Sequence, residues 1–123
     1  MRSPSSKKIH RSLIGIAENI DLAKRFVAGC DAVAFAADIR TVYAVTRSLE
    51  IISEAVRRLP SALTSRHPGV PWYKIKAAGN IYRHEYDNVS PTMLWNTVDT
   101  ALDELEKAVQ CELRAFEPPE KQE

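Results

Sequence analysis

Polar and titratable side chains are concentrated in one short stretch of this chain, between Lys76 and Asp87. Asn80 precedes His84 by four residues, so in a helix the two side chains share one face, with Arg83 beside them. Histidine is the side chain whose unperturbed pKa lies near neutrality, and arginine has the fork geometry that suits a phosphate. The pattern indicates proton transfer next to a cation. It also fits a solvated helix face that happens to carry one histidine.

The rest of the sequence predicts an all-α protein. Apolar residues recur at intervals of three and four, and no segment alternates with period two. The first helix is expected over residues 9–27, with Ser6 as its N-cap and Gly29 as its stop. A second is expected over residues 35–59, ending before Pro60. At about 1.5 Å per residue it would be near 36 Å long, which suggests that part of it faces a second copy of the chain.

The second half predicts three more helical elements. A short turn is expected over residues 61–66, and Pro71 suits the first position of the next helix. That helix should bury Trp72, Ile75, Gly79, Tyr82 and Tyr86 on the side opposite the polar stripe. Ser90 and Pro91 suit the N-cap and N1 of a last helix over residues 94–116. Short connections favour an antiparallel up-and-down bundle of four main helices plus one short helix.

Length and composition are those of one soluble domain. The chain has 123 residues, 45% hydrophobic and 27% charged, which predicts a single domain over 1–123, ordered over about 7–116. A net charge of +1 provides no bulk attraction to nucleic acid, so any RNA contact must be local. Cys30 and Cys111 predict reduced thiols in a cytoplasmic protein, and the three histidines have no metal-ligand spacing. No signal peptide or membrane-spanning run is recognisable.

Four short motifs in order resemble the HepT-like family of HEPN-domain proteins, and the resemblance extends from about Lys8 to Leu113. The motifs cover residues 49–55, 66–72, 80–86 and 94–95.

The resemblance implies a toxin of a toxin–antitoxin module, paired with a minimal nucleotidyltransferase antitoxin. In this family the HEPN domain forms a homodimer, and an Arg-(four to six residues)-His motif lines a cleft that cleaves RNA, either tRNA or mRNA, without metal. No cofactor is implied. Carried onto this chain, the histidine is His84, the preceding polar residue is Asn80, and the tyrosine that the partner adenylylates is Tyr86.

One position departs from the family pattern. Most members have Arg directly before the Asn, where this chain has Gly79. On an ideal helix that position lies about 140° from His84, whereas Arg83 lies about 100° from it. Arg83 could replace the missing arginine, act across the dimer, or mark a lineage that no longer cuts RNA. Lys76, two turns before His84, is a second candidate to bind substrate.

RNA cleavage is chemically reasonable for this set of residues. RNA carries its own nucleophile, the 2′-OH, so the reaction needs a group that moves a proton and a cation that stabilises charge on the phosphate. His84 suits the first role, and Arg83 or Lys76 the second. Asn80 could bind the scissile group or fix the His84 tautomer. The alternative is a non-catalytic helical dimer that binds, and is modified by, a nucleotidyltransferase.

Other polar and aromatic residues favour structural roles. Glu50 and Glu54 lie one turn apart on one helix face, where hydrogen bonding is favoured over paired acid–base catalysis. Trp72 and Trp95 favour packing in the core or an interface over base stacking.

Overall fold

The computed structural model describes residues 5–85, 87 and 89–116, and it is helical in all its regular elements. The elements are α1 (Ser6–Val27), α2 (Ala32–Ala37), α3 (Ile39–Arg57), α4 (Ser61–Thr64), α5 (Trp72–His84), α6 (Pro91–Asn96), the π-helical turn η2 (Thr97–Ala101) and α7 (Leu102–Arg114). The all-α prediction is confirmed. None of the helices in these residues is both long and apolar enough to cross a membrane.

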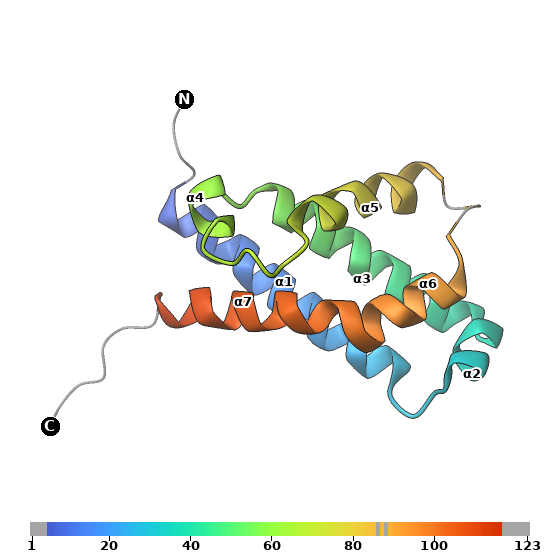
Figure 1. Ribbon diagram of the computed structural model, residues 1–123. Coiled ribbons are helices and arrows are strands. Elements are labelled where there is room, and N and C mark those ends of the chain that lie inside the picture. Colours follow the sequence, from blue (N-terminus) through green and yellow to red (C-terminus); the bar gives the residue numbers. More distant parts are fainter. Residues whose placement is uncertain (1–4, 86, 88, 117–123) are drawn as a thin grey trace, which may run out of the picture.

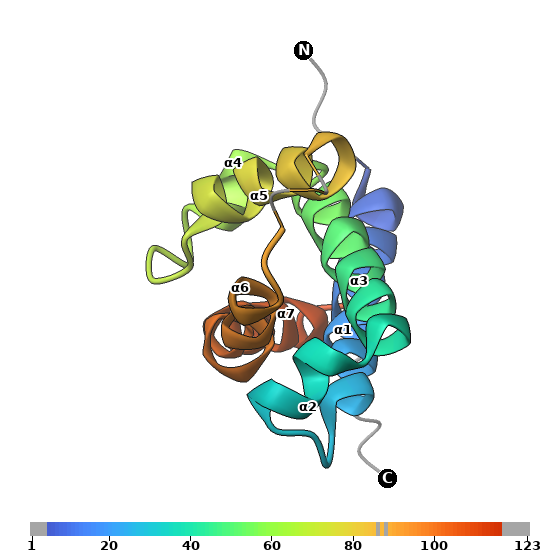
Figure 2. The same ribbon diagram turned by 90° about the vertical axis from the view of Figure 1, so that its right-hand side faces the viewer.

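The long helices form an antiparallel bundle in which α1 and α3 occupy the middle (Figure 1). Helix α3 packs between α1 and α5, and α1 packs between α3 and α7. Seen after a quarter turn, α5 and the α6–α7 segment lie on the same side of the α1–α3 pair, with α5 above and the α6–α7 segment below (Figure 2). One face of α3 therefore supports α5, the helix that carries the predicted site.

The core is formed by the apolar stripes of these helices. Its largest fully buried side chains include Leu13, Ile16, Phe35, Ile52 and Leu105. Full burial of a side chain of this size stabilises the fold by about 1.5–3 kcal/mol. Trp95 lies partly buried with its ring 5.8 Å from that of Phe35, centroid to centroid, in agreement with a packing role.

Helix α1 ends at the predicted residue, Val27, and begins three residues before the predicted start at Ile9. The cap is Ser5, not Ser6, and its hydroxyl oxygen accepts a hydrogen bond from the Lys8 amide at 3.3 Å. Gly29 follows the helix with φ of +80°, a left-handed conformation that glycine adopts without steric cost. The stop predicted from Gly29 is confirmed.

The prediction of one long helix over residues 35–59 is wrong. The segment divides at Asp38, which has an extended backbone and caps α3 through its carboxylate. The carboxylate accepts hydrogen bonds from the Arg40 amide at 3.1 Å and the Thr41 hydroxyl at 2.7 Å. Such local bonds compete with helix continuation. Because α3 has 19 residues, it is only about 28 Å long, so excess length no longer supports a dimer.

The last helix begins as predicted and then changes its winding. The Ser90 hydroxyl caps α6, accepting from the Met93 amide at 3.1 Å, and Pro91 follows at N1. The chain then passes through the π-helical turn η2 into α7. Burial raises the pKa of Tyr82 on α5, while a hydrogen bond to Thr97 at the start of η2 opposes that shift. This contact ties α5 to the last helix.

The connection before α5 is fixed to α7 by one buried carboxylate. Glu112, with a side chain 9% exposed, binds Arg66 at 2.7 Å and the Nε2 atom of His67 at 2.6 Å. The Trp72 indole donates a hydrogen bond to the His67 carbonyl at 3.0 Å. Trp72, the first residue of α5, is thereby bonded to the connection before it, which Glu112 in turn fixes to α7.

Candidate phosphate-binding site

The predicted site residues lie along the contact between α3 and α5, which is unusually close at Ser53 and Gly79. Ser53 is buried, and its hydroxyl donates a hydrogen bond to the Ile75 carbonyl of α5 at 2.8 Å. A Cβ atom at position 79 would lie 2.9 Å from the Ser53 Cβ and closer still to its hydroxyl oxygen. Real Cβ atoms do not approach other atoms this closely, so the helix pair requires glycine here.

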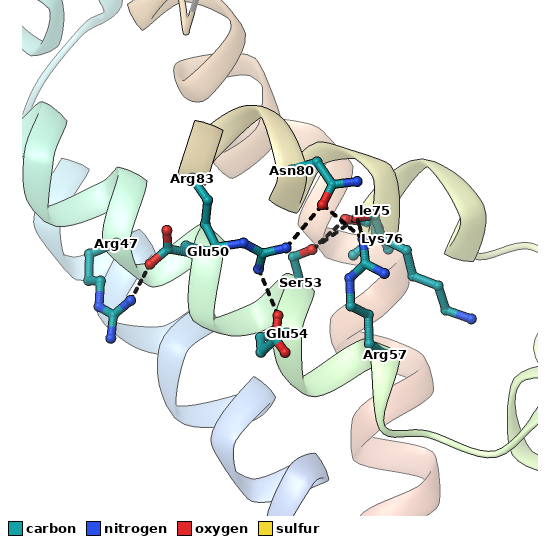
Figure 3. A network of polar contacts seen from close by, with 9 residues as sticks. All are labelled: Arg47, Glu50, Ser53, Glu54, Arg57, Ile75, Lys76, Asn80 and Arg83. Carbon is teal, nitrogen blue, oxygen red and sulfur yellow. Dashed lines mark hydrogen bonds and ion pairs between the residues drawn. The ribbon is translucent and has the colours of Figure 1, made fainter. Parts of the chain in front are cut away.

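Arg83 extends from α5 back across this contact to α3 (Figure 3). Its guanidinium donates to a Glu54 carboxylate oxygen at 2.7 Å and to the Asn80 side-chain oxygen at 3.0 Å. The Arg83 side chain is 30% exposed and that of Glu54 45% exposed, so solvent screens the pair and its contribution to stability is small. Two of the five N–H donors of the guanidinium are used in these bonds, which leaves three for a ligand.

Arg57 of α3 approaches the side-chain amide of Asn80 from the side opposite Arg83. It donates to the Lys76 carbonyl at 2.8 Å and to the Asn80 side-chain oxygen at 3.4 Å. Asn80 thus lies between two guanidinium groups, both drawn in Figure 3. The Lys76 side chain extends away from Arg83, so Lys76 joins this cluster through its backbone and not through its charge.

His84 is the last residue of α5 and is exposed. Its ring makes no hydrogen bond or ion pair with any other residue that the structure describes. The structure therefore brings Asn80 and Arg83 together and leaves the His84 ring free to meet a ligand. Tyr86, the predicted modification site, lies outside the described residues; α5 ends two residues before it.

Three residues of this cluster were absent from the predicted catalytic set: Ser53, Glu54 and Arg57. Glu54 had been assigned a hydrogen-bonding role, which its bond to Arg83 confirms. The sequence does carry a signal for the other two. Ser53 is a small polar residue on a predicted helix, and Arg57 lies one turn after Glu54 on the same helix, which indicates a polar helix face but not its partner.

The described part of the chain contains no group of three or more His, Cys, Asp or Glu side chains arranged to hold a metal ion. The polar side-chain groups of the site are two guanidinium groups, the Glu54 carboxylate that pairs with one of them, the Ser53 hydroxyl, the Asn80 amide and an exposed imidazole. Guanidinium and amide donors are suited to bind a phosphate, and an imidazole is suited to transfer a proton. Fold and site together define an all-α bundle with a candidate phosphate-binding surface at the α3–α5 contact.

The chain belongs to the ribonuclease HepT-like family, whose sequence profile matches residues 16–112. The protein named "Probable ribonuclease HepT" from Thermococcus cleftensis is 34% identical over 93 residues, covering 75% of this chain and 84% of that protein. A "Putative RNase" from Caldanaerobacter subterraneus subsp. tengcongensis is 42% identical over 67 residues, covering 54% of this chain. The match spans 60% of the latter protein's length. No solved structure matches the chain.

Proposed function

We propose that this protein is a metal-independent endoribonuclease that acts as the toxin of a cytoplasmic toxin–antitoxin module. The observation that carries the proposal is the arrangement at the end of α5. An exposed histidine follows directly after an arginine whose guanidinium is held by side-chain hydrogen bonds to Glu54 and to Asn80. Membership of the ribonuclease HepT-like family, and the ribonuclease names of the relatives, support the same activity.

The proposed reaction uses the 2′-OH of the RNA as nucleophile. His84 accepts the proton of that hydroxyl as its oxygen attacks the phosphorus, and the bond from phosphorus to the 5′-oxygen breaks. A proton returns to the 5′-oxygen, leaving a 2′,3′-cyclic phosphate and a 5′-hydroxyl. Arg83 stabilises the negative charge that develops on the phosphate oxygens. Asn80 fixes Arg83 and presents its NH₂ group to the substrate.

The family's partners complete the proposal. A homodimer would place two copies of His84 in one cleft facing tRNA or mRNA, and a minimal nucleotidyltransferase would silence the toxin by adenylylating Tyr86. The added phosphodiester is anionic and would compete with RNA for Arg83. Sedimentation at micromolar concentration tests the dimer, since a single monomeric species would contradict this part of the proposal.

The experiment that tests the activity is incubation of the purified chain with total tRNA and with mRNA in the presence of EDTA. The expected products are fragments that end in a 2′,3′-cyclic phosphate, identified by mass. Intact RNA at all times, with a folded protein, would contradict the proposal.

A second candidate function is favoured by Gly79. With no arginine before Asn80, and with the Arg83 charge shared with Glu54, the chain would be a non-catalytic helical dimer that a nucleotidyltransferase binds and modifies. This function predicts adenylylation of a chain that cuts no RNA and does not inhibit growth when expressed alone.

A further inference from the structure

A wide groove follows the contact between α1 and α3, on the side where Arg83 reaches across from α5. Three small residues, Ser12 and Gly15 of α1 and Ala55 of α3, line its bottom. Because their side chains are short, the surface is hollowed between longer side chains on either side.

The groove carries a strong local excess of positive charge. Its basic lining residues are Lys8, Arg11, Arg47, Arg57, Arg58 and Arg83. Only two acidic residues line it, Glu50 and Glu54, and each is already paired, with Arg47 and Arg83 respectively. Six basic and two acidic side chains give a net charge of +4. The whole chain has a net charge of only +1, so the excess belongs to this surface.

Four of these cations have no carboxylate partner among the residues that the structure describes: Lys8, Arg11, Arg57 and Arg58. Lys8 and Arg11 lie one turn apart on α1, and Arg57 and Arg58 end α3. Unpaired cations on both sides of a groove can each bind one of the negative charges along an extended polyanion.

The groove is continuous with the candidate site. Arg57 and Arg83 both line it, and both donate hydrogen bonds to Asn80. A ligand that follows the groove therefore arrives at the residues that precede His84 on α5.

We infer that this groove holds the sugar–phosphate backbone of single-stranded RNA and leads the strand to Asn80, Arg83 and His84. The inference rests on the proposed ribonuclease function, since it supplies the path by which substrate reaches that site. No aromatic side chain lines the groove, so base stacking does not contribute, and binding should depend little on base sequence.

The same lining disfavours an acidic protein segment as the occupant. Protein interfaces depend on apolar and aromatic anchors seated in pockets. Here the apolar lining residues are Ile51, which is partly exposed, and Ala55 and Leu59, which are each only 5% exposed, and none of the three is aromatic. RNA carries a negative charge at every nucleotide, so an RNA strand can interact with the cations that line the groove.

The test measures binding without cleavage. Full-length His84→Ala protein is titrated with fluorescently labelled oligouridylate and oligoadenylate of about 12 nucleotides, within the usual length range of a single-strand site. Fluorescence anisotropy gives the affinity at 50 and 200 mM salt. Arg11→Gln and Arg58→Gln are then added singly. The matched control is Arg40→Gln, the same change on α3 outside the groove.

Each groove variant should bind RNA more weakly and lose one phosphate contact. For single strands, the logarithm of the affinity changes with the logarithm of the salt concentration by a slope of about −0.7 per phosphate contact. Loss of one contact should therefore lower the ratio of the affinity at 50 mM salt to that at 200 mM salt by about 2.6-fold. Arg40→Gln should leave both quantities unchanged, and the two oligonucleotides should bind alike. Equal effects of all three substitutions, no RNA binding by the His84→Ala protein, or displacement by oligoglutamate as effective as by unlabelled RNA would overturn the inference.

Failure of the groove and failure of the proposed function give different results. If the unsubstituted chain cleaves RNA but Arg11→Gln and Arg58→Gln bind as Arg40→Gln does, only the groove inference is wrong. If binding depends on the groove while the unsubstituted chain cuts no RNA, only the ribonuclease function is wrong.

Discussion

Gly79 packs against Ser53 at the closest approach of α5 to α3, with no room for a side chain at position 79. An arginine at position 79 would clash with Ser53 unless the two helices moved apart. The space in front of Gly79 is filled by the Ser53 hydroxyl, which is bonded to the Ile75 carbonyl. Arg83, four residues later, lies beside this position, with its guanidinium 3.8 Å from where a Gly79 Cβ would be.

Introducing any side chain at position 79 should therefore separate the two helices. Gly79→Ala should lower the free energy of unfolding by about 1–3 kcal/mol, as overpacking of a tight contact does. Gly79→Arg should cost at least as much and should not raise RNA cleavage. Denaturant unfolding measures the first effect, and cleavage assays on the folded fraction the second.

Ser53→Gly serves as the paired variant. Alone it should destabilise the protein, since it loses a hydrogen bond and places glycine inside a helix at a cost of about 1 kcal/mol. Combined with Gly79→Ala it should cost less than the sum of the single changes, because it removes the opposing atoms. Strict additivity, or a stable and more active Gly79→Arg protein, would contradict this account of the contact.

Arg83 should matter more for cleavage than Lys76. If Arg83 stabilises charge on the phosphate, Arg83→Ala should lower the cleavage rate by about 10²–10³, as loss of an oxyanion donor does. Lys76→Ala should do less, because the Lys76 side chain extends away from Arg83 (Figure 3). Rates under single-turnover conditions check both. Equal insensitivity at the two positions would favour the non-catalytic function.

Glu112 should make the stability depend on pH in the acid range. Its hydrogen bonds from Arg66 and then His67 hold the pKa of this carboxyl below its ordinary value of 4.5, although burial opposes them. A carboxyl with a lowered folded-state pKa stabilises the fold fully above its ordinary pKa, and this stabilisation is lost as the pH falls through the folded-state pKa. The free energy of unfolding should therefore decrease as the pH is lowered below about 4.5.

Glu112→Gln should isolate that contribution. At pH 7 it should lower the free energy of unfolding by about 1–3 kcal/mol, because it weakens bonds to a buried group. The difference from the unsubstituted protein should shrink as the pH falls below 4.5. Glu104→Gln, which affects only the exposed pair with Lys107, is the control and should change little. A Glu112→Gln difference that is constant from pH 3 to pH 7 would contradict the assignment.

Tyr86 should be the residue through which a nucleotidyltransferase silences the protein. Co-expression with the partner should add one or more AMP units to Tyr86, detected by intact-mass and peptide mass spectrometry. Tyr86→Phe should remain toxic in the presence of the partner, because the acceptor hydroxyl is gone. Full silencing of the Phe variant through a stable complex would show that modification is not the mechanism.

The sequence was sufficient for the fold class and for the approximate positions of the long helices, but not for the break at Asp38. Periodicity and the caps at Ser90 and Gly29 reflect local rules, and the structure confirms them. The break at Asp38 was missed because the apolar spacing continues across it, while the capping bonds to Arg40 and Thr41 are local. A segment whose apolar residues recur at helical spacing can still contain a side chain that caps a new helix and so interrupts the first.

The site could be predicted in part. Asn80 and Arg83 share a helix and lie three residues apart, so their proximity follows from helix geometry. Arg57 and Glu54 belong to another helix, and their contacts with Asn80 and Arg83 depend on how closely α3 and α5 pack. That distance is set by Ser53 and Gly79, two small residues whose pairing becomes evident only when the helices are placed in space.

The most direct test of the account is the single-turnover rate of RNA cleavage by His84→Ala protein, measured in EDTA beside the unsubstituted chain. His10→Ala is the matched control, because His10 stacks on Phe116 with ring centroids 4.8 Å apart and lies outside the candidate site. His84→Ala should lower the rate by about 10²–10⁴ with an unchanged melting temperature, while His10→Ala should retain the full rate. A well-folded His84→Ala protein that cleaves RNA as fast as the unsubstituted chain would contradict the catalytic role of His84.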